Sequence, residues 1–108
     1  MSYSVRLLAR AKRDLRSMYG YIAQRSQEGA DRWEAAFYTA TNRLKSNPFS
    51  CGMAPEDERV DFELRQMFFK TPHGRRYRAV FTVDGEDVII LRLRGPGQAP
   101  LVEGELKP

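Results

Sequence analysis

Four arginines are spaced so that their side chains could hold an anion. They lie in two runs, residues 75–83 and 87–94, whose β-branched and aromatic residues and Asp84-Gly85-Glu86 link are typical of a β-hairpin. Side chains alternate between the two faces of a strand, so each run has one apolar face and one face with two arginines. A guanidinium group stays charged at neutral pH and forks onto phosphate or carboxylate oxygens, which makes anion binding the chemistry to consider. The four side chains are Arg76, Arg78, Arg92 and Arg94.

The length of the hairpin loop decides which of these arginines face one another. With a three-residue loop, Phe81 pairs with Ile89 and Arg78 lies opposite Arg92. A two-residue loop would place Arg78 opposite Leu91 and mix the apolar and charged rows, so we predict the longer loop or a bulge. The apolar row of the second run is then Ile89, Leu91 and Leu93. Like charges that face each other repel, and a facing pair of arginines therefore indicates that an anion lies between them.

Four further elements must position this hairpin. Apolar residues alternate with a period of two in two short stretches and recur at helical spacing in two longer ones. The predicted elements are a strand at residues 3–8, a helix from Ala11 to about Arg25, a helix from about Ala30 to Ser46 and a strand at residues 62–70. The link between the helices is short, so they form an antiparallel pair. On the first helix Tyr19 falls in the buried stripe, which leaves Tyr21 for a partner surface.

Together these elements predict an α+β fold. The order is strand, helix, helix and three strands, and the last three strands pair as an antiparallel meander. The helical pair covers one face of a small antiparallel sheet, and the other face, with the arginines, is open. We expect residues 1–97 to form a single domain, because 108 residues supply one modest core. Residues 98–108 show little periodicity and are expected to form a tail that is partly ordered at best.

Composition narrows the classes of function. A net charge of +4 and a pI near 9.5 permit an acidic partner, either nucleic acid or protein, without choosing between them. The single cysteine, Cys51, excludes an internal disulfide, and with only one histidine we expect neither a metal site nor another cofactor. No stretch is long and apolar enough for a signal peptide or a membrane span, so we expect a cytoplasmic protein without a membrane partner.

From residue 3 to residue 93 the chain resembles the RelE/ParE toxins of bacterial type II toxin–antitoxin modules. The resemblance rests on short pieces whose order and spacing are specific when taken together. They are Val5-Arg6-Leu7, Ala11, Asp14-Leu15 and Tyr19–Ala23, then Ala30, Phe37, Leu44 and Pro48, then Leu64-Arg65, Tyr77–Phe81 and Val88–Leu91. The resemblance implies a small cytoplasmic toxin that is neutralised by a co-encoded antitoxin, whose C-terminal segment wraps around it.

The two branches of this superfamily have different targets. RelE-like members cleave messenger RNA in the ribosomal A site with a basic cluster on the open sheet face, whereas ParE-like members poison DNA gyrase without catalytic residues. Asp14-Leu15 and Tyr21-Ile22-Ala23 are more similar to the ParE branch, and Arg76-Tyr77-Arg78 is more similar to the RelE branch. The first hypothesis is therefore a ribosome-dependent endoribonuclease, and the second is a gyrase inhibitor. A decayed toxin that keeps only antitoxin binding is the third.

Under the first hypothesis the RelE resemblance assigns roles to individual residues. Arg78 matches the arginine that holds the scissile phosphate, and Arg65 falls near a basic residue of the preceding strand. We predict that Arg65, Arg78 and Arg92 bind and polarise phosphate. The predicted RNA-binding residues are Arg76, Arg94, Lys70 and His73.

RNA cleavage also needs a base for the 2′-hydroxyl, and arginine is a poor base. The two candidates are His73, which has a second interpretation as an exposed turn residue, and Glu63, which has a second interpretation as a salt-bridge partner. The chain departs from the RelE pattern at two places. Met67 stands where a second basic residue is expected in the strand, and no basic or aromatic pair follows Arg94.

Overall fold

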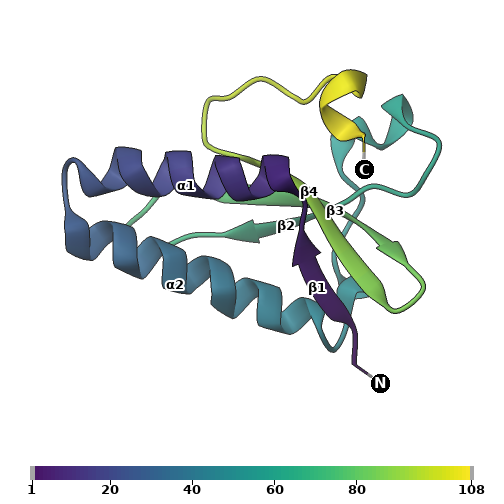
Figure 1. Ribbon diagram of the computed structural model, residues 1–108, viewed down its shortest axis with the longest axis horizontal. Helices are drawn as coiled ribbons and strands as arrows, with labels where there is room; N and C mark the ends of the chain where they lie inside the picture. Colours follow the sequence, from purple (N-terminus) through teal and green to yellow (C-terminus); the bar gives the residue numbers. More distant parts are fainter. Residues whose placement is uncertain (1, 108) are drawn as a thin grey trace.

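The computed structural model describes residues 2–107 and has the predicted order of elements. The strands and helices are β1 (Ser4–Leu7), α1 (Ala9–Ala23), α2 (Gln27–Leu44), β2 (Arg65–Phe69), β3 (Tyr77–Asp84) and β4 (Asp87–Arg94). Three short 3-10 turns complete the list: η1 (Pro48–Ser50), η2 (Pro55–Arg59) and η3 (Glu103–Leu106). The predicted α+β class is confirmed (Figure 1). No helix among the described residues is long and apolar enough to cross a membrane.

The four strands form one sheet in the order β1-β4-β3-β2. Neighbouring strands β2, β3 and β4 are antiparallel, as the sequence predicts, but β1 pairs with β4 in parallel. The sheet is therefore mixed, and the prediction of a wholly antiparallel sheet is wrong for its first strand. The reason is topological: the helical pair separates β1 from the other strands, so no tight turn has to join it to its neighbour.

The two helices form an antiparallel pair because their sequences specify where the chain must turn. The side chain of Ser26 accepts a hydrogen bond from the N–H of Gly29 at 2.9 Å and so caps the N-terminus of α2. Across the pair, the hydroxyl of Tyr19 donates to Asp31. Both helices turn an apolar stripe toward the sheet, which is the arrangement that their periodicity predicts.

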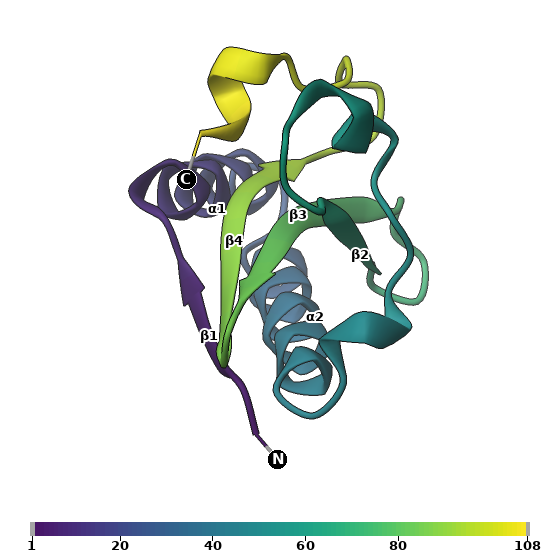
Figure 2. The same cartoon turned by 90° about the vertical axis from the view of Figure 1, so that its right-hand side faces the viewer.

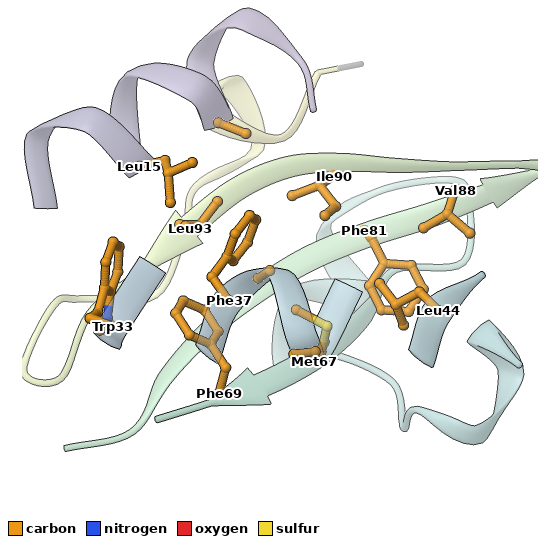
Figure 3. Close-up of a cluster of buried hydrophobic side chains, with 13 residues drawn as sticks. Leu15, Trp33, Phe37, Leu44, Met67, Phe69, Phe81, Val88, Ile90 and Leu93 are labelled. Atoms are coloured by element: carbon orange, nitrogen blue, oxygen red, sulfur yellow. The ribbon is translucent and has the colours of Figure 1, made fainter. Parts of the chain in front are cut away.

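The main hydrophobic core lies between the helices and the sheet (Figure 3). Every helix and every strand from β2 to β4 contributes to it. Its buried members are Ala11, Leu15, Trp33, Phe37, Ala40, Leu44, Met67, Phe69, Ala79, Phe81, Val88, Ile90 and Leu93. Trp33 lies at one end of this cluster and Leu44 at the other.

A β-bulge in the hairpin determines which side chains face this core. The loop has two residues, with Asp84 opposite Asp87 and Gly85 at a φ of 62°, so the predicted three-residue loop is wrong. The predicted bulge is present, and it shifts the register between Val80 and Phe81 so that Arg78 lies opposite Arg94 rather than Arg92. Because an extra residue reverses the alternation, Val88, Ile90 and Leu93 face the helices, while Leu91 faces the other side.

The second face of the sheet is covered, and the prediction of an open face is wrong. Figures 1 and 2 show η2 and the yellow C-terminal segment together on the side of the sheet away from α2. They enclose a second apolar cluster of Ala54, Leu64, Val80, Leu91, Leu101 and Leu106. Leu101 and Leu106 are fully buried, so residues 98–107 do not form the partly ordered tail that their lack of periodicity predicts. Val80 and Leu91 need an apolar cover, and this segment supplies it.

Leu101→Ala tests how strongly the C-terminal segment is held. It should lower the free energy of unfolding by about 2–5 kcal/mol, because it leaves a cavity in the second cluster. The neighbouring Val102 is 57% exposed, and Val102→Ala should cost less than about 0.5 kcal/mol. Urea unfolding of both variants would measure the difference, and equal stabilities would contradict the integral role of this segment.

Candidate functional site

Three of the predicted arginines lie together on the second face of the sheet, the one that η2 and the C-terminal segment cover. We call it the covered face. On β3, Arg78 alternates with Ala79 of the main core and therefore shares its face with Val80. On β4, Arg94 lies opposite Arg78 and Arg92 lies opposite Val80. The expectation that Arg78 and Arg92 emerge on the same face is therefore confirmed. The side chains of all three are only 15–16% exposed.

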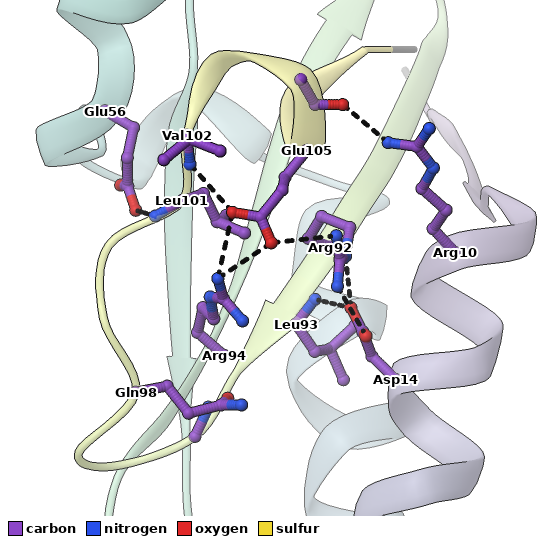
Figure 4. Close-up of polar contacts among 12 residues, drawn as sticks. Arg10, Asp14, Glu56, Arg92, Leu93, Arg94, Gln98, Leu101, Val102 and Glu105 are labelled. Atoms are coloured by element: carbon purple, nitrogen blue, oxygen red, sulfur yellow. Dashed lines mark hydrogen bonds and ion pairs between the residues drawn. The ribbon is translucent and has the colours of Figure 1, made fainter.

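Arg78 is held by a buried carboxylate, that of Glu56 in η2. Its two terminal nitrogens donate to the two carboxylate oxygens, with Nη1 to Oε1 at 2.9 Å. Glu56 Oε2 also accepts the backbone N–H of Leu101 at 2.9 Å, as Figure 4 shows. Burial by itself raises the pKa of Glu56, but the hydrogen bonds from Arg78 and Leu101 outweigh it and hold the pKa below its ordinary value. Glu56 is therefore a buried, ionised group.

Arg92 and Arg94 are held by carboxylates from α1 and η3 (Figure 4). Asp14 accepts hydrogen bonds from Nε of Arg92 at 2.8 Å and from its Nη2 at 3.0 Å. It also accepts a hydrogen bond from the backbone N–H of Leu93. Hydrogen bonding to Asp14 raises the pKa of Arg92. Glu105 lies 3.2 Å from Arg94 and 3.6 Å from Arg92, and its hydrogen bond from the N–H of Val102, together with both arginines, lowers its pKa.

The C-terminal segment is fixed by further contacts around these ion pairs. Arg59 of η2 donates to the carbonyl oxygen of Leu101, and Arg10 of α1 donates to that of Gly104 at 2.8 Å. The arginines of the sheet thus face acidic and backbone groups of their own chain. Three carboxylates balance their three charges and offset the repulsion between them, so no external anion is needed.

Arg65 does not join Arg78 and Arg92. It lies opposite Phe81, so it belongs to the row that faces the helices. Its Nη1 donates to the carbonyl oxygen of Cys51 at 2.7 Å, and its guanidinium carbon lies 5.1 Å from the ring centroid of Phe49. Glu63, a candidate base, is 3.7 Å from Arg65. The salt-bridge interpretation of Glu63 is confirmed.

The remaining predicted residues lie in and beside the turn between β2 and β3. Lys70, His73 and Arg76 are all exposed there. The guanidinium of Arg76 stacks 3.9 Å from the ring centroid of Phe68. Phe68 lies opposite Arg78, so Arg76 adjoins the paired arginines but, unlike them, is exposed. Among residues 2–107 no group of three or more His, Cys, Asp and Glu side chains is placed to hold a metal ion.

The sequence analysis missed the acidic partners of the arginines. Glu56 belongs to an acidic run that resembles a solvated loop, Asp14 lies on the polar side of α1, and Glu105 follows a stretch without periodicity. A usable signal was present in the hairpin itself. In simple alternation Arg78 shares a strand face with Val80, and Arg92 with Ile90; such arginines are partly buried, and buried guanidinium groups require carboxylates nearby.

Comparison with known proteins identifies the family. The chain matches, over residues 5–100, the model of the ParE toxin of the type II toxin–antitoxin system, parDE. It therefore belongs to this family and is a type II toxin of the RelE/ParE superfamily, as the sequence resemblance implies.

One solved structure extends this comparison. The RelBE2 toxin–antitoxin complex from Mycobacterium tuberculosis contains a chain that is 23% identical, with a TM-score of 0.54. The match covers 87% of the present chain and 98% of the other, and at this identity it is an argument for the shared fold alone. No curated protein matches the sequence.

Arg78→Ala should destabilise the protein by about 3–5 kcal/mol, because it leaves the buried carboxylate of Glu56 without its partner. Arg76→Ala is the matched control, since Arg76 is exposed and its stacking on Phe68 contributes less than about 1 kcal/mol. Chemical denaturation of the two variants measures both effects. A stable Arg78→Ala variant would show that Glu56 is not held ionised by this arginine.

Glu56 also makes the stability depend on pH. Its pKa is lower in the folded than in the unfolded protein, so its stabilising contribution is present above the ordinary carboxyl value of 4.5 and is lost as the pH falls through the folded value. Glu56→Gln should be less stable near neutral pH and should lose less stability on acidification. Unfolding curves between about pH 7 and pH 3 measure this slope, with the exposed neighbour change Glu58→Gln as control. Identical slopes in Glu56→Gln and wild type would contradict the role of Glu56.

Proposed function

We propose that this toxin inhibits growth by binding a protein target, as ParE-like toxins bind DNA gyrase, and that it does not act by cutting messenger RNA. The observation that carries the proposal is that Arg78, Arg92 and Arg94 are bound by carboxylates of their own chain. Under the RelE resemblance, Arg78 and Arg92 would be directed at the scissile phosphate and Arg94 would hold the RNA backbone. Here their charges stabilise the fold.

A phosphate could reach Arg78 only by displacing Glu56. That exchange would leave an ionised carboxylate buried without a partner, which costs several kcal/mol. It would also break the hydrogen bond from Leu101 and loosen the C-terminal segment. The energetic balance therefore favours the internal pair over an external anion.

The groups needed for RNA cleavage also lie apart. Arg65 and Glu63 form a salt bridge with each other. Arg65 belongs to the row that faces the helices, on the opposite side of the sheet from Arg78 and Arg92. Cleavage requires a base beside the 2′-hydroxyl while the phosphate charge is stabilised at the same place. Protein binding makes no such demand on geometry, because affinity depends on a few well-placed contact residues.

We further propose a cognate antitoxin as the physiological partner, encoded in the adjacent reading frame. The structurally similar RelBE2 chain was solved as a toxin–antitoxin complex. The present protein has a net charge of +4, which favours binding of an acidic partner segment.

Ribosome-dependent cleavage is the second candidate, and one observation favours it. Lys70, Arg75 and Arg76 are exposed beside the turn between β2 and β3 and form no ion pair within residues 2–107. Such cations could contact an RNA backbone. This surface would bind RNA without the paired arginines of the sheet.

Induction of the wild-type toxin in cells tests the two candidates against each other. Gyrase inhibition predicts DNA damage, measured with a damage-response reporter, and unchanged 5′ ends of cellular messages. The variant Lys70→Ala/Arg76→Ala, which removes exposed cations without touching either core, should arrest growth as the wild type does. New 5′ ends on induction, lost in this variant, would overturn the proposal in favour of cleavage. Normal growth on induction of the folded wild type would indicate a decayed toxin.

A further inference from the structure

A pocket of about 720 Å³ opens at the end of the helical pair. It lies between the C-terminal part of α1, the start of α2, the turn between β2 and β3, and the loop that follows β4. The side chains that matter for its chemistry are Met18, Tyr21, Arg25, Trp33, Arg75 and Tyr77. Pockets that receive ligands or anchoring side chains have volumes in the range of about 300–1,000 Å³, so this one can hold a bulky group.

Tyr21 makes one wall of this pocket and is not used by the fold. It is 60% exposed, although it lies on the helix that contributes Leu15 to the main core. The guanidinium carbon of Arg25 lies 5.6 Å from its ring centroid, which holds the ring and the charge beside each other. Tyrosine, tryptophan and arginine are the residues that contribute most to binding energy at protein interfaces, and here all three types line one pocket.

Trp33 supplies an unused hydrogen-bond donor. The residue is 3% exposed, and within residues 2–107 its indole N–H has no hydrogen-bond acceptor. Figure 3 shows this indole at the end of the core cluster. This nitrogen is enclosed by the protein, so an entering side chain meets the ring of Trp33 and would reach the donor only if neighbouring groups moved.

The charge of the pocket selects the partner. Arg25 and Arg75 line it, and among residues 2–107 no acidic side chain does. A second pocket, beside Tyr19 on the helical pair, is smaller at about 540 Å³ and mixes Lys12 and Arg16 with Glu34. The first pocket therefore fits an acidic segment with an apolar anchor, whereas the second has no such preference.

We infer that this pocket binds the protein target of the toxin. An acidic segment of the target inserts one aromatic or aliphatic side chain between Tyr21, Trp33 and Tyr77. Carboxylates of the same segment lie against Arg25 and Arg75. This inference rests on the proposed function, since it assigns a surface to a toxin that acts by protein binding.

Binding of the purified toxin to purified DNA gyrase tests the inference. Tyr21→Ala and Arg75→Glu should each weaken binding at least about tenfold and reduce growth arrest, because each removes a side chain that lines the pocket. The matched controls are Tyr38→Ala and Arg13→Glu, which change an exposed tyrosine and an exposed arginine outside the pocket and should bind as the wild type does. Thermal unfolding of all four variants shows whether they are folded.

Three outcomes would overturn the inference, and they are distinguishable. If the pocket variants bind gyrase as tightly as the wild type, the pocket is wrong while the proposed function stands. If they lose only binding to the antitoxin, the pocket belongs to that partner instead. If the wild-type toxin does not bind gyrase and cleaves messages, the proposed function fails and the inference fails with it.

Discussion

The ion pair between Arg78 and the buried Glu56 connects three segments that are far apart in the sequence. It joins the middle of the sheet to η2, and through the N–H of Leu101 it also fixes the C-terminal segment. A carboxylate taken out of water must be compensated by charge and by hydrogen bonds, and Glu56 receives both. The two segments that cover the second face of the sheet therefore share one arginine, and that arginine is not available for another ligand while they are in place.

The β-bulge in the hairpin makes this arrangement possible. A regular register would have placed Leu91 and Leu93 on the same face and divided the charged residues differently. The shift between Val80 and Phe81 sends Leu93 to the helical core and brings Arg92 and Arg94 to the face of Arg78. One extra residue thus creates a compact basic cluster, and acidic groups from α1, η2 and η3 neutralise it.

The sequence predicts those parts of the fold whose signal is periodic. Both helices, the three later strands and the apolar stripe with Trp33, Phe37 and Leu44 follow from spacing alone, and Tyr21 was correctly placed outside the core. The cover of the second face could not be predicted in this way. Residues 98–107 and the acidic run near Glu56 have no period, because their conformation is set by tertiary contacts with distant residues.

The same limit applies to the candidate site. The partners of Arg78 and Arg92 lie 22 and 78 positions away along the chain, so no local window contains both members of either pair. The composition gives the number of charged residues but not which arginine pairs with which carboxylate. The basic hairpin therefore resembled an anion-binding surface, and only the three-dimensional arrangement shows that the anions are internal carboxylates.

The parallel pairing of β1 with β4 bears on how the protein is made. Ser4 pairs with Asp87, so β1 must wait for its partner strand until both helices and two further strands have been made. Synthesis proceeds at roughly 5–20 residues per second, and contacts this distant in the chain form slowly. The helical pair can assemble early, but the surfaces that require the finished sheet do not exist on the nascent chain. A partner that recognises those surfaces can bind the toxin only after β4 has been made and has joined the sheet.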